Sequence, residues 1–166
     1  MARGQATGQP SRADAHPEEH RPARFDARLG DASLNLLLDT HVWVWSQETP
    51  ERLGRRTSRL LVSGDHTNTV CAISTLEIAR LVAAGDIELS MPLRDWVSRS
   101  LAALEAETLP ITHDVALEAY ALPGRFHRDP ADRLLVAAAR CYDLTVVTAD
   151  SRILRYPEVC SSDARH

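Results

Sequence analysis

Four acidic positions in this chain each lie where an aliphatic run ends or a helical pattern begins. They are Asp39, Glu77, the pair Asp129 and Asp132, and Asp150. Carboxylates gathered at one rim of a sheet repel one another unless a cation neutralises them. Oxygen ligands without supporting Cys or His select Mg²⁺ or Mn²⁺ rather than zinc. Because such an ion activates water and stabilises a phosphorane-like transition state, the pattern predicts a metal site suited to phosphodiester hydrolysis.

Most of these acids also have a purely structural interpretation. Asp39, Asp129 and Asp150 precede predicted helices, where a carboxylate is an ordinary N-cap. Ser74 followed three residues later by Glu77 has the form of a capping box, with Ser74 as the N-cap. Their joint occurrence at corresponding topological positions is what favours a shared site.

Polar residues beside the acids have two interpretations as well. Thr148 and Ser74 could orient a metal-bound water, or could simply be a β-former and an N-cap. Arg128 and Arg133 flank the acids and suit bidentate contact with the phosphates of a substrate, or surface ion pairs with neighbouring carboxylates. Asp132 lies in an otherwise apolar helical stretch, which favours a functional role for it.

The elements that must position these residues alternate between strand and helix patterns. Short aliphatic or β-branched runs predict strands, and amphipathic stretches between them predict helices. Strands are expected at residues 34–38, 69–73, 108–111 and 144–147, with a weak fifth at 157–159, and helices after residues 39, 50, 74, 92, 112, 129 and 150. This alternation predicts an α/β fold with a mostly parallel, helix-covered sheet of four to five strands. In such sheets chemistry collects beyond the carboxyl ends of the strands.

The chain of 166 residues is expected to contain one domain. Residues 1–32 are rich in Gly, Pro, Arg, Asp and His and have almost no large apolar side chains. Such a segment cannot offset its ordering entropy, so we expect a disordered extension, either a genuine tail or the result of an upstream start codon. The domain is expected at residues 33–160, and residues 161–166 are expected to form a tail.

Composition narrows the protein class and the compartment. The formal net charge is −4, so any nucleic-acid binding must depend on local arginines or on a metal. The chain has no lysine, which excludes P-loop NTPases and the phosphoaspartate enzymes that need an active-site lysine. Three cysteines without metal spacing, together with the lack of a membrane-spanning stretch or signal-peptide core, predict a reducing, cytoplasmic location.

Four motifs resemble those of the PIN domain family, specifically the VapC-like toxins of bacterial toxin–antitoxin pairs. They are Leu-Leu-Leu-Asp39-Thr-His-Val-Trp, Ala72-Ile-Ser-Thr-Leu-Glu77-Ile-Ala, His127-Arg-Asp129-Pro-Ala-Asp132-Arg-Leu-Leu-Val-Ala-Ala and Val147-Thr-Ala-Asp150. The resemblance runs from Leu36 to about Val159 and implies a three-layer α/β/α PIN-like fold. A mild departure is Ala131, where the family usually has an aromatic residue, and it leaves the carboxylates untouched.

The resemblance also implies an activity, a site and partners. The activity is that of a Mg²⁺-dependent endoribonuclease, the toxin of a VapBC-type module, with Mn²⁺ able to replace Mg²⁺. In the implied mechanism, Asp39, Asp132 and Asp150 hold the metal, and Glu77 positions or deprotonates the attacking water. Asp129 either caps its helix or supports the metal shell. The implied partners are an RNA substrate, a cognate antitoxin protein and a second copy in a homodimer, without a membrane.

Two alternatives belong to other classes. A catalytically silent PIN domain that binds RNA or a partner would have lost at least one carboxylate, whereas this chain keeps the complete set. A DNA nuclease of flap-endonuclease type shares the acidic rim but carries additional helical elements for which this chain has no room. The sequence therefore favours the ribonuclease, with the silent binding module as the alternative.

Overall fold

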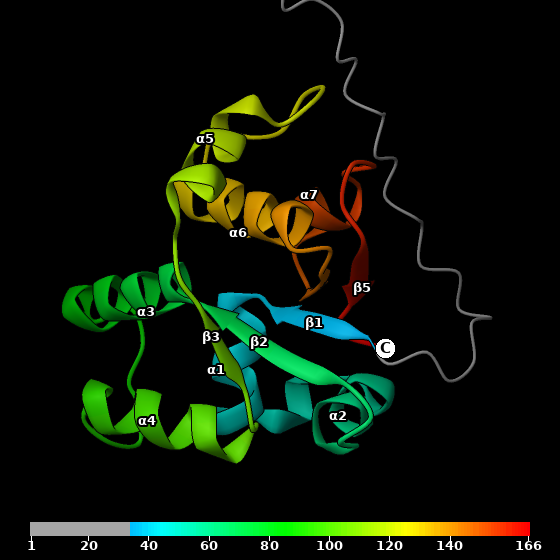
Figure 1. Ribbon diagram of the computed structural model, residues 1–166. Coiled ribbons are helices and arrows are strands. Elements are labelled where there is room, and N and C mark those ends of the chain that lie inside the picture. The colour runs from blue at the N-terminus through cyan, green and yellow to red at the C-terminus, as the bar shows by residue number, and fades with distance from the viewer. Residues whose placement is uncertain (1–33) are drawn as a thin grey trace, which may run out of the picture.

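A computed structural model of the chain describes residues 34–166, which form a central sheet with helices on both faces (Figure 1). The disorder predicted for residues 1–32 lies outside the described residues. In chain order the elements are β1 (Asn35–Leu38), α1 (Thr40–Glu48), the 3-10 helix η1 (Pro50–Arg52), α2 (Arg55–Val62), β2 (Thr67–Cys71), α3 (Ala72–Ala84), α4 (Leu93–Ala103), β3 (Glu107–Leu109), α5 (His113–Ala121), α6 (Pro130–Cys141), β4 (Thr145–Thr148), α7 (Ser151–Leu154) and β5 (Ser161–Asp163). Within this described part, none of the helices has the length and apolarity that crossing a bilayer requires.

The sheet has five strands in the order β3-β2-β1-β4-β5, and every neighbouring pair is parallel. This confirms the predicted α/β class, and the helices on both faces complete three layers (Figure 1). From β1 the chain adds β2 and β3 on one side and then returns to add β4 and β5 on the other. The order therefore reverses between β1 and β4, whose carboxyl ends border the crevice in which open α/β sheets bind ligands.

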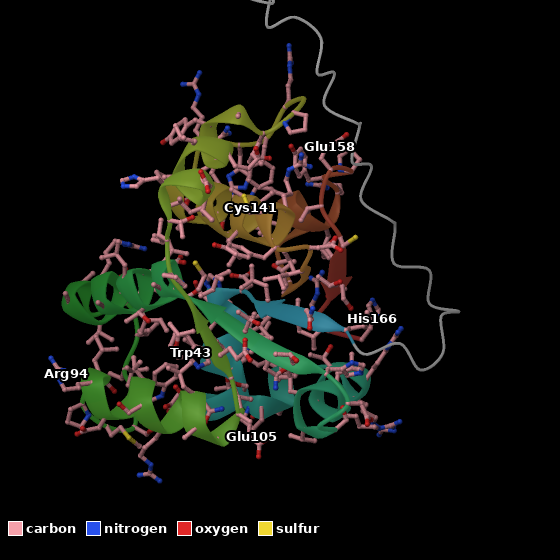
Figure 2. The ribbon with its side chains drawn as sticks, in the orientation of Figure 1. Trp43, Arg94, Glu105, Cys141, Glu158 and His166 are labelled. Carbon is pink, nitrogen blue, oxygen red and sulfur yellow. The ribbon has the colours of Figure 1, made fainter. Side chains whose placement is uncertain are left out.

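Alternate residues of β1 enter two separate cores. Leu37 packs with residues of α5, α6 and α7 on one face of the sheet, whereas Leu36 and Leu38 pack with α1, α2 and α4 on the other. In this second core the ring centroids of Trp43, which Figure 2 labels, and Trp96 lie 5.0 Å apart. Because β1 is buried on both faces, the residue that follows it is attached to a rigid element.

Several boundaries differ from those that the sequence predicted. β2 ends at Cys71 and α3 begins at the next residue, without a loop between them. Ser74 therefore lies inside the first turn of α3, and the prediction that it is the N-cap is wrong. The helix expected from Pro50 is a 3-10 turn followed by the separate helix α2, because Leu53 and Gly54 between them are extended.

Residues 161–166, expected to be a tail, belong to the folded domain. β5 pairs with β4, Ala164 is fully buried, and the Gly54 amide donates to the Ala164 carbonyl at 2.9 Å. A Cβ on Gly54 would lie 2.3 Å from the carbonyl oxygen of His166, the last residue of the chain (labelled in Figure 2), so only glycine admits the chain end here. The Ser-Ser-Asp sequence of β5 has no strand pattern because backbone pairing at the sheet edge, rather than apolar burial, holds it.

Candidate active site

Asp39 directly follows β1 at the border of the crevice between β1 and β4. Its amide donates to the Val147 carbonyl at 3.0 Å, and Thr148 Oγ1 donates to its Oδ2 at 2.5 Å. The residue is only 5% exposed, and this burial raises the pKa of its carboxyl, while the Thr148 hydrogen bond lowers it. Asp39 stands at the N-cap position of α1 but its side chain caps nothing. The hydrogen bond that holds its carboxylate comes from Thr148 rather than from the first turn of α1.

Glu77 reaches from α3 to the start of α1. Thr40 Oγ1 donates to Glu77 Oε2 at 2.7 Å. The Glu77 charge is close enough to Asp39 to raise its pKa further, so the two acids share one environment. Ser74, one turn before Glu77, is fully buried, and its hydroxyl has no hydrogen-bond partner among residues 34–166. The capping box is thus not formed, and Glu77 is oriented by Thr40.

The start of α6 brings Asp129 and Asp132 to the same crevice. Asp129 Oδ1 accepts from the backbone amides two and three residues after it, at 2.9 and 3.3 Å, which confirms its N-cap interpretation. Burial raises the pKa of Asp132 to about 7, and the carboxylates of Asp39, Asp129 and Asp150 contribute to the rise. His127 Nε2 lies 3.2 Å from Asp132 Oδ2 but is not aligned for a hydrogen bond. Asp132 is therefore a partly buried carboxylate surrounded by other negative charges.

Asp150 follows β4 and is paired with an arginine on the next turn. Its Oδ1 accepts from the Arg152 amide at 2.7 Å, so Asp150 caps α7. The Arg152 side chain then folds back: Nε lies 3.1 and 3.0 Å from the two Asp150 oxygens, and Nη2 lies 2.5 Å from Asp150 Oδ2. The same Nη2 lies 3.3 Å from Asp132 Oδ2. These hydrogen bonds from Arg152 hold the pKa of Asp150 below its usual value.

Thr148 connects the two strand-end acids. It is fully buried in β4, where its hydroxyl donates to Asp39 and accepts from the Asp150 amide at 2.9 Å. One hydroxyl therefore fixes the carboxylate after β1 and the backbone after β4 together. These two hydrogen bonds go beyond what β propensity alone would require of a threonine at this position.

The two flanking arginines have different surroundings. Arg133 Nε donates to the Ala119 carbonyl at 2.7 Å, and Nη1 donates to the carbonyls of His127 at 3.1 Å and Phe126 at 3.4 Å. Arg133 thus ties α6 to α5 and to the preceding loop, and neither of its predicted roles describes these contacts. Arg128 is exposed in that loop beside the N-cap of α6.

We define the acidic cluster as Asp39, Glu77, Asp132 and Asp150, the four acids that the resemblance to the PIN domain family assigns to the site. Sequence reasoning missed two residues that hold this cluster. Thr40 directly follows Asp39, and Arg152 lies two residues after Asp150. The only signal in the sequence was that these two residues lie close to Asp39 and Asp150. The acid that each of them contacts depends on the direction in which α1 and α7 leave the sheet.

The chemistry of the acidic cluster suits a hard divalent cation. Its donors are carboxylate oxygens from four elements, and their mutual repulsion adds to burial in raising the pKa of Asp132. One cation, the Arg152 guanidinium, already lies against Asp132 and Asp150. Within residues 34–166 no three acidic, histidine or cysteine side chains are spaced to hold an ion in this arrangement. Carboxylate oxygens are the kind of donor that suits Mg²⁺ or Mn²⁺, and the Arg152 guanidinium lies against two of these carboxylates as a metal cation would.

Comparison with known proteins identifies the fold family. The family model of the PIN domain matches residues 36–159. The chain belongs to the PIN domain family. Over 118 residues it is 38% identical to Ribonuclease VapC22 from Mycobacterium tuberculosis (strain ATCC 25618 / H37Rv), an alignment that covers 71% of this chain and 88% of that protein.

Solved structures with this PIN fold include two VapBC complexes. One is VapBC2 from Rickettsia felis, solved bound to a DNA fragment from their promoter. It matches this chain with a TM-score of 0.59 at 15% identity, and the match covers 78% of this chain and 98% of that one. VapBC-1 from nontypeable Haemophilus influenzae gives a TM-score of 0.56 at 16% identity, with 80% and 100% covered. At these identities the likeness concerns the fold.

Proposed function

We propose that this PIN domain is a metal-dependent endoribonuclease, the toxin of a VapBC-type toxin–antitoxin module. The observation that carries the proposal is the meeting of Asp39, Glu77, Asp132 and Asp150 at the carboxyl ends of β1 and β4, in a network where each acid affects another's pKa or hydrogen bonds. Sequence identity to a ribonuclease of the same family supports the choice of RNA as substrate.

We assign the metal to Asp39, Asp132 and Asp150, with Glu77 beside them, and Mg²⁺ or Mn²⁺ as the ion. When bound there, such an ion activates water and neutralises charge on the phosphodiester. Thr148 keeps the Asp39 carboxylate turned toward the crevice in this arrangement. Asp129 supports the site indirectly, because capping α6 fixes the turn that carries Asp132.

Glu77 is assigned to the attacking water. The Thr40 hydroxyl occupies Glu77 Oε2, so Oε1 is the atom that would orient the water and accept its proton. In-line attack then leaves a 5′-phosphate and a 3′-hydroxyl on the cleaved RNA. Arg128, exposed at the rim, is placed to bind a backbone phosphate of the substrate.

We further propose a cytoplasmic protein with a cognate antitoxin and a second copy of itself as partners. Structural relatives include a toxin–antitoxin complex from Klebsiella pneumoniae, similar in fold at 19% identity. Leu61 and Trp96 are buried in the core and are not available for such surfaces. Leu76 on α3 and Leu117 and Tyr120 on α5 are the large apolar side chains that remain exposed on helices near the site.

The test is cleavage of a labelled RNA pool by purified, antitoxin-free protein in Mg²⁺, in Mn²⁺ and in EDTA. Asp39→Asn runs beside the wild type, and Asp86→Asn, in the exposed turn after α3, is the matched control. The proposal predicts cleavage in either metal, lost in EDTA and in Asp39→Asn but kept in Asp86→Asn. Folded wild-type protein that cleaves no RNA would instead support the silent binding module.

A further inference from the structure

The Arg152 guanidinium makes an uncommon set of contacts for a surface arginine. It donates to both oxygens of Asp150 and, through Nη2, to Asp132 Oδ2 at 3.3 Å. Asp132 and Asp150 come from different elements, the first turn of α6 and the end of β4. Arg152 therefore joins two parts of the acidic cluster that no other cation among residues 34–166 joins.

Comparison with Arg133 separates this arrangement from ordinary structural support. Arg133 donates to three backbone carbonyls and so connects segments that must stay together in every state of the protein. Within residues 34–166, all hydrogen bonds of the Arg152 guanidinium go to carboxylates of the acidic cluster. Its side chain is 52% exposed, so water screens its ion pairs and little free energy is needed to break them.

The contacts of Arg152 coincide with those that a metal ion would need. Nη2 lies against Oδ2 of Asp150 and Oδ2 of Asp132. A divalent cation shared by these two residues takes up oxygens of the same carboxylates, and it adds positive charge beside the guanidinium. Because like charges repel strongly at such short range, the guanidinium and the metal exclude one another.

We propose that Arg152 is an internal counter-ion that competes with the divalent cation for Asp132 and Asp150 and is displaced when the metal binds. The inference rests on the proposed function, since that function supplies the metal. In the metal-free protein, Arg152 keeps the two carboxylates together and limits their repulsion. Metal binding then has to break the Arg152 contacts, and the metal affinity of the wild type is lower than the acidic cluster alone would give.

The experiment is a Mn²⁺ titration of the metal-free protein, followed by the electron paramagnetic resonance signal of free Mn²⁺. Arg152→Gln removes the competitor, and Arg152→Lys keeps the charge but loses the bidentate contact. Arg155→Gln is the matched control, because Arg155 lies at the end of the same helix and contacts Ser151 rather than an acid. Melting temperatures with and without saturating Mn²⁺ give a second readout that needs no RNA.

The proposal predicts that Arg152→Gln binds Mn²⁺ more tightly than the wild type by roughly three- to tenfold, the scale expected for losing one partly exposed charged contact. Arg152→Lys is intermediate and Arg155→Gln is unchanged. The metal-induced rise in melting temperature is also larger in Arg152→Gln.

Equal or weaker Mn²⁺ binding by Arg152→Gln overturns the proposal, and weaker binding would identify Arg152 as a residue that pre-organises the metal ligands. That result would not contradict the proposed function, because the wild type could still cleave RNA with a bound metal. If neither the wild type nor Arg152→Gln binds Mn²⁺, the proposed function fails together with the inference.

Discussion

Asp39 and Glu77 lie in the half of the crevice built by β1 and α3, and a threonine hydroxyl holds each of them. Asp132 and Asp150 lie in the half built by α6 and α7, where the Arg152 guanidinium holds both. The first half contains Asp39, which is the most buried carboxylate of the cluster. Its counterpart in the second half, Asp150, is paired with Arg152, whose side chain is half exposed.

The difference between these two halves is one of chemistry. A neutral hydroxyl can keep its hydrogen bond while the carboxylate's other lone pairs bind a cation. A guanidinium carries the charge that the cation would bring, so it cannot stay in place. We infer that the threonine-held half is pre-organised for the metal and that the arginine-held half rearranges when the metal binds.

Replacing Asp39 in the pre-organised half should have the largest effect on activity. Asp39→Asn keeps an oxygen that can accept from Thr148 but removes the charge that binds metal. We expect RNA cleavage to fall by at least about 100-fold, because a direct metal ligand is lost. The melting temperature of the metal-free protein should not fall, since a buried carboxylate with a raised pKa has been neutralised. A variant that cleaves RNA at close to the wild-type rate would remove Asp39 from the site.

Thr148 tests whether the hydroxyls themselves matter. Thr148→Val keeps the shape of the side chain but leaves Asp39 Oδ2 and the Asp150 amide without their shared partner. We expect a loss of roughly 1–3 kcal/mol in the free energy of unfolding, and roughly tenfold slower cleavage through a misplaced ligand. Thr148→Ser, which restores the hydroxyl, should recover most of both. Equal cleavage rates in the Val and Ser variants would show that the hydroxyl does not position the acids.

Asp132 gives the second half a characteristic pH dependence. Its folded-state pKa of about 7 exceeds the ordinary value of 3.8, so its ionisation opposes folding above pH 7, and this penalty disappears as pH falls toward 4. Asp132→Asn should therefore be more stable than the metal-free wild type at pH 8 by roughly 1–3 kcal/mol, with the difference vanishing near pH 4. Denaturant unfolding at several pH values measures this.

Asp150 is the internal control for that experiment. Arg152 holds the pKa of Asp150 below its usual value, so the ionised carboxylate stabilises the fold at pH values above the unfolded pKa. Asp150→Asn should consequently lower stability at pH 8, the opposite sign from Asp132→Asn. The same sign for both variants would mean that Arg152 does not distinguish the two acids.

Arg128 should produce the smallest effect. As an exposed cation at the rim, it is expected to contribute one phosphate contact, so Arg128→Gln should weaken RNA binding two- to threefold and reduce the salt slope by roughly 0.7. Filter binding in EDTA, at several salt concentrations, measures this without cleavage.

Arg133→Gln should instead lower stability, because it breaks contacts with three backbone carbonyls. Loss of RNA affinity in a stable Arg133→Gln protein would reverse these assignments.

Much of this arrangement could be predicted from the sequence. The aliphatic runs before Asp39 and Asp150 mark the two strands whose carboxyl ends meet, so the acids could be placed together by topology alone. Ser74 was misplaced because its capping-box pattern begins inside the first turn of a helix that starts directly from a strand. The contacts of Thr40 and Arg152 could not be predicted from the sequence. Thr40 donates a hydrogen bond to Glu77 on α3, and Arg152 folds back over α7 to reach Asp132 on α6. The chain end was missed because β5 depends on backbone pairing.

The most direct test of the two-half account is an anomalous difference map from crystals of the protein soaked in Mn²⁺. The account predicts a peak within about 2.2 Å of carboxylate oxygens from both halves, including Asp39 and at least one of Asp132 and Asp150, with the Arg152 guanidinium withdrawn from them. The Thr148–Asp39 hydrogen bond should persist. A bound ion ligated by only one half, or one bound while Arg152 keeps its contacts with both carboxylates, would contradict it.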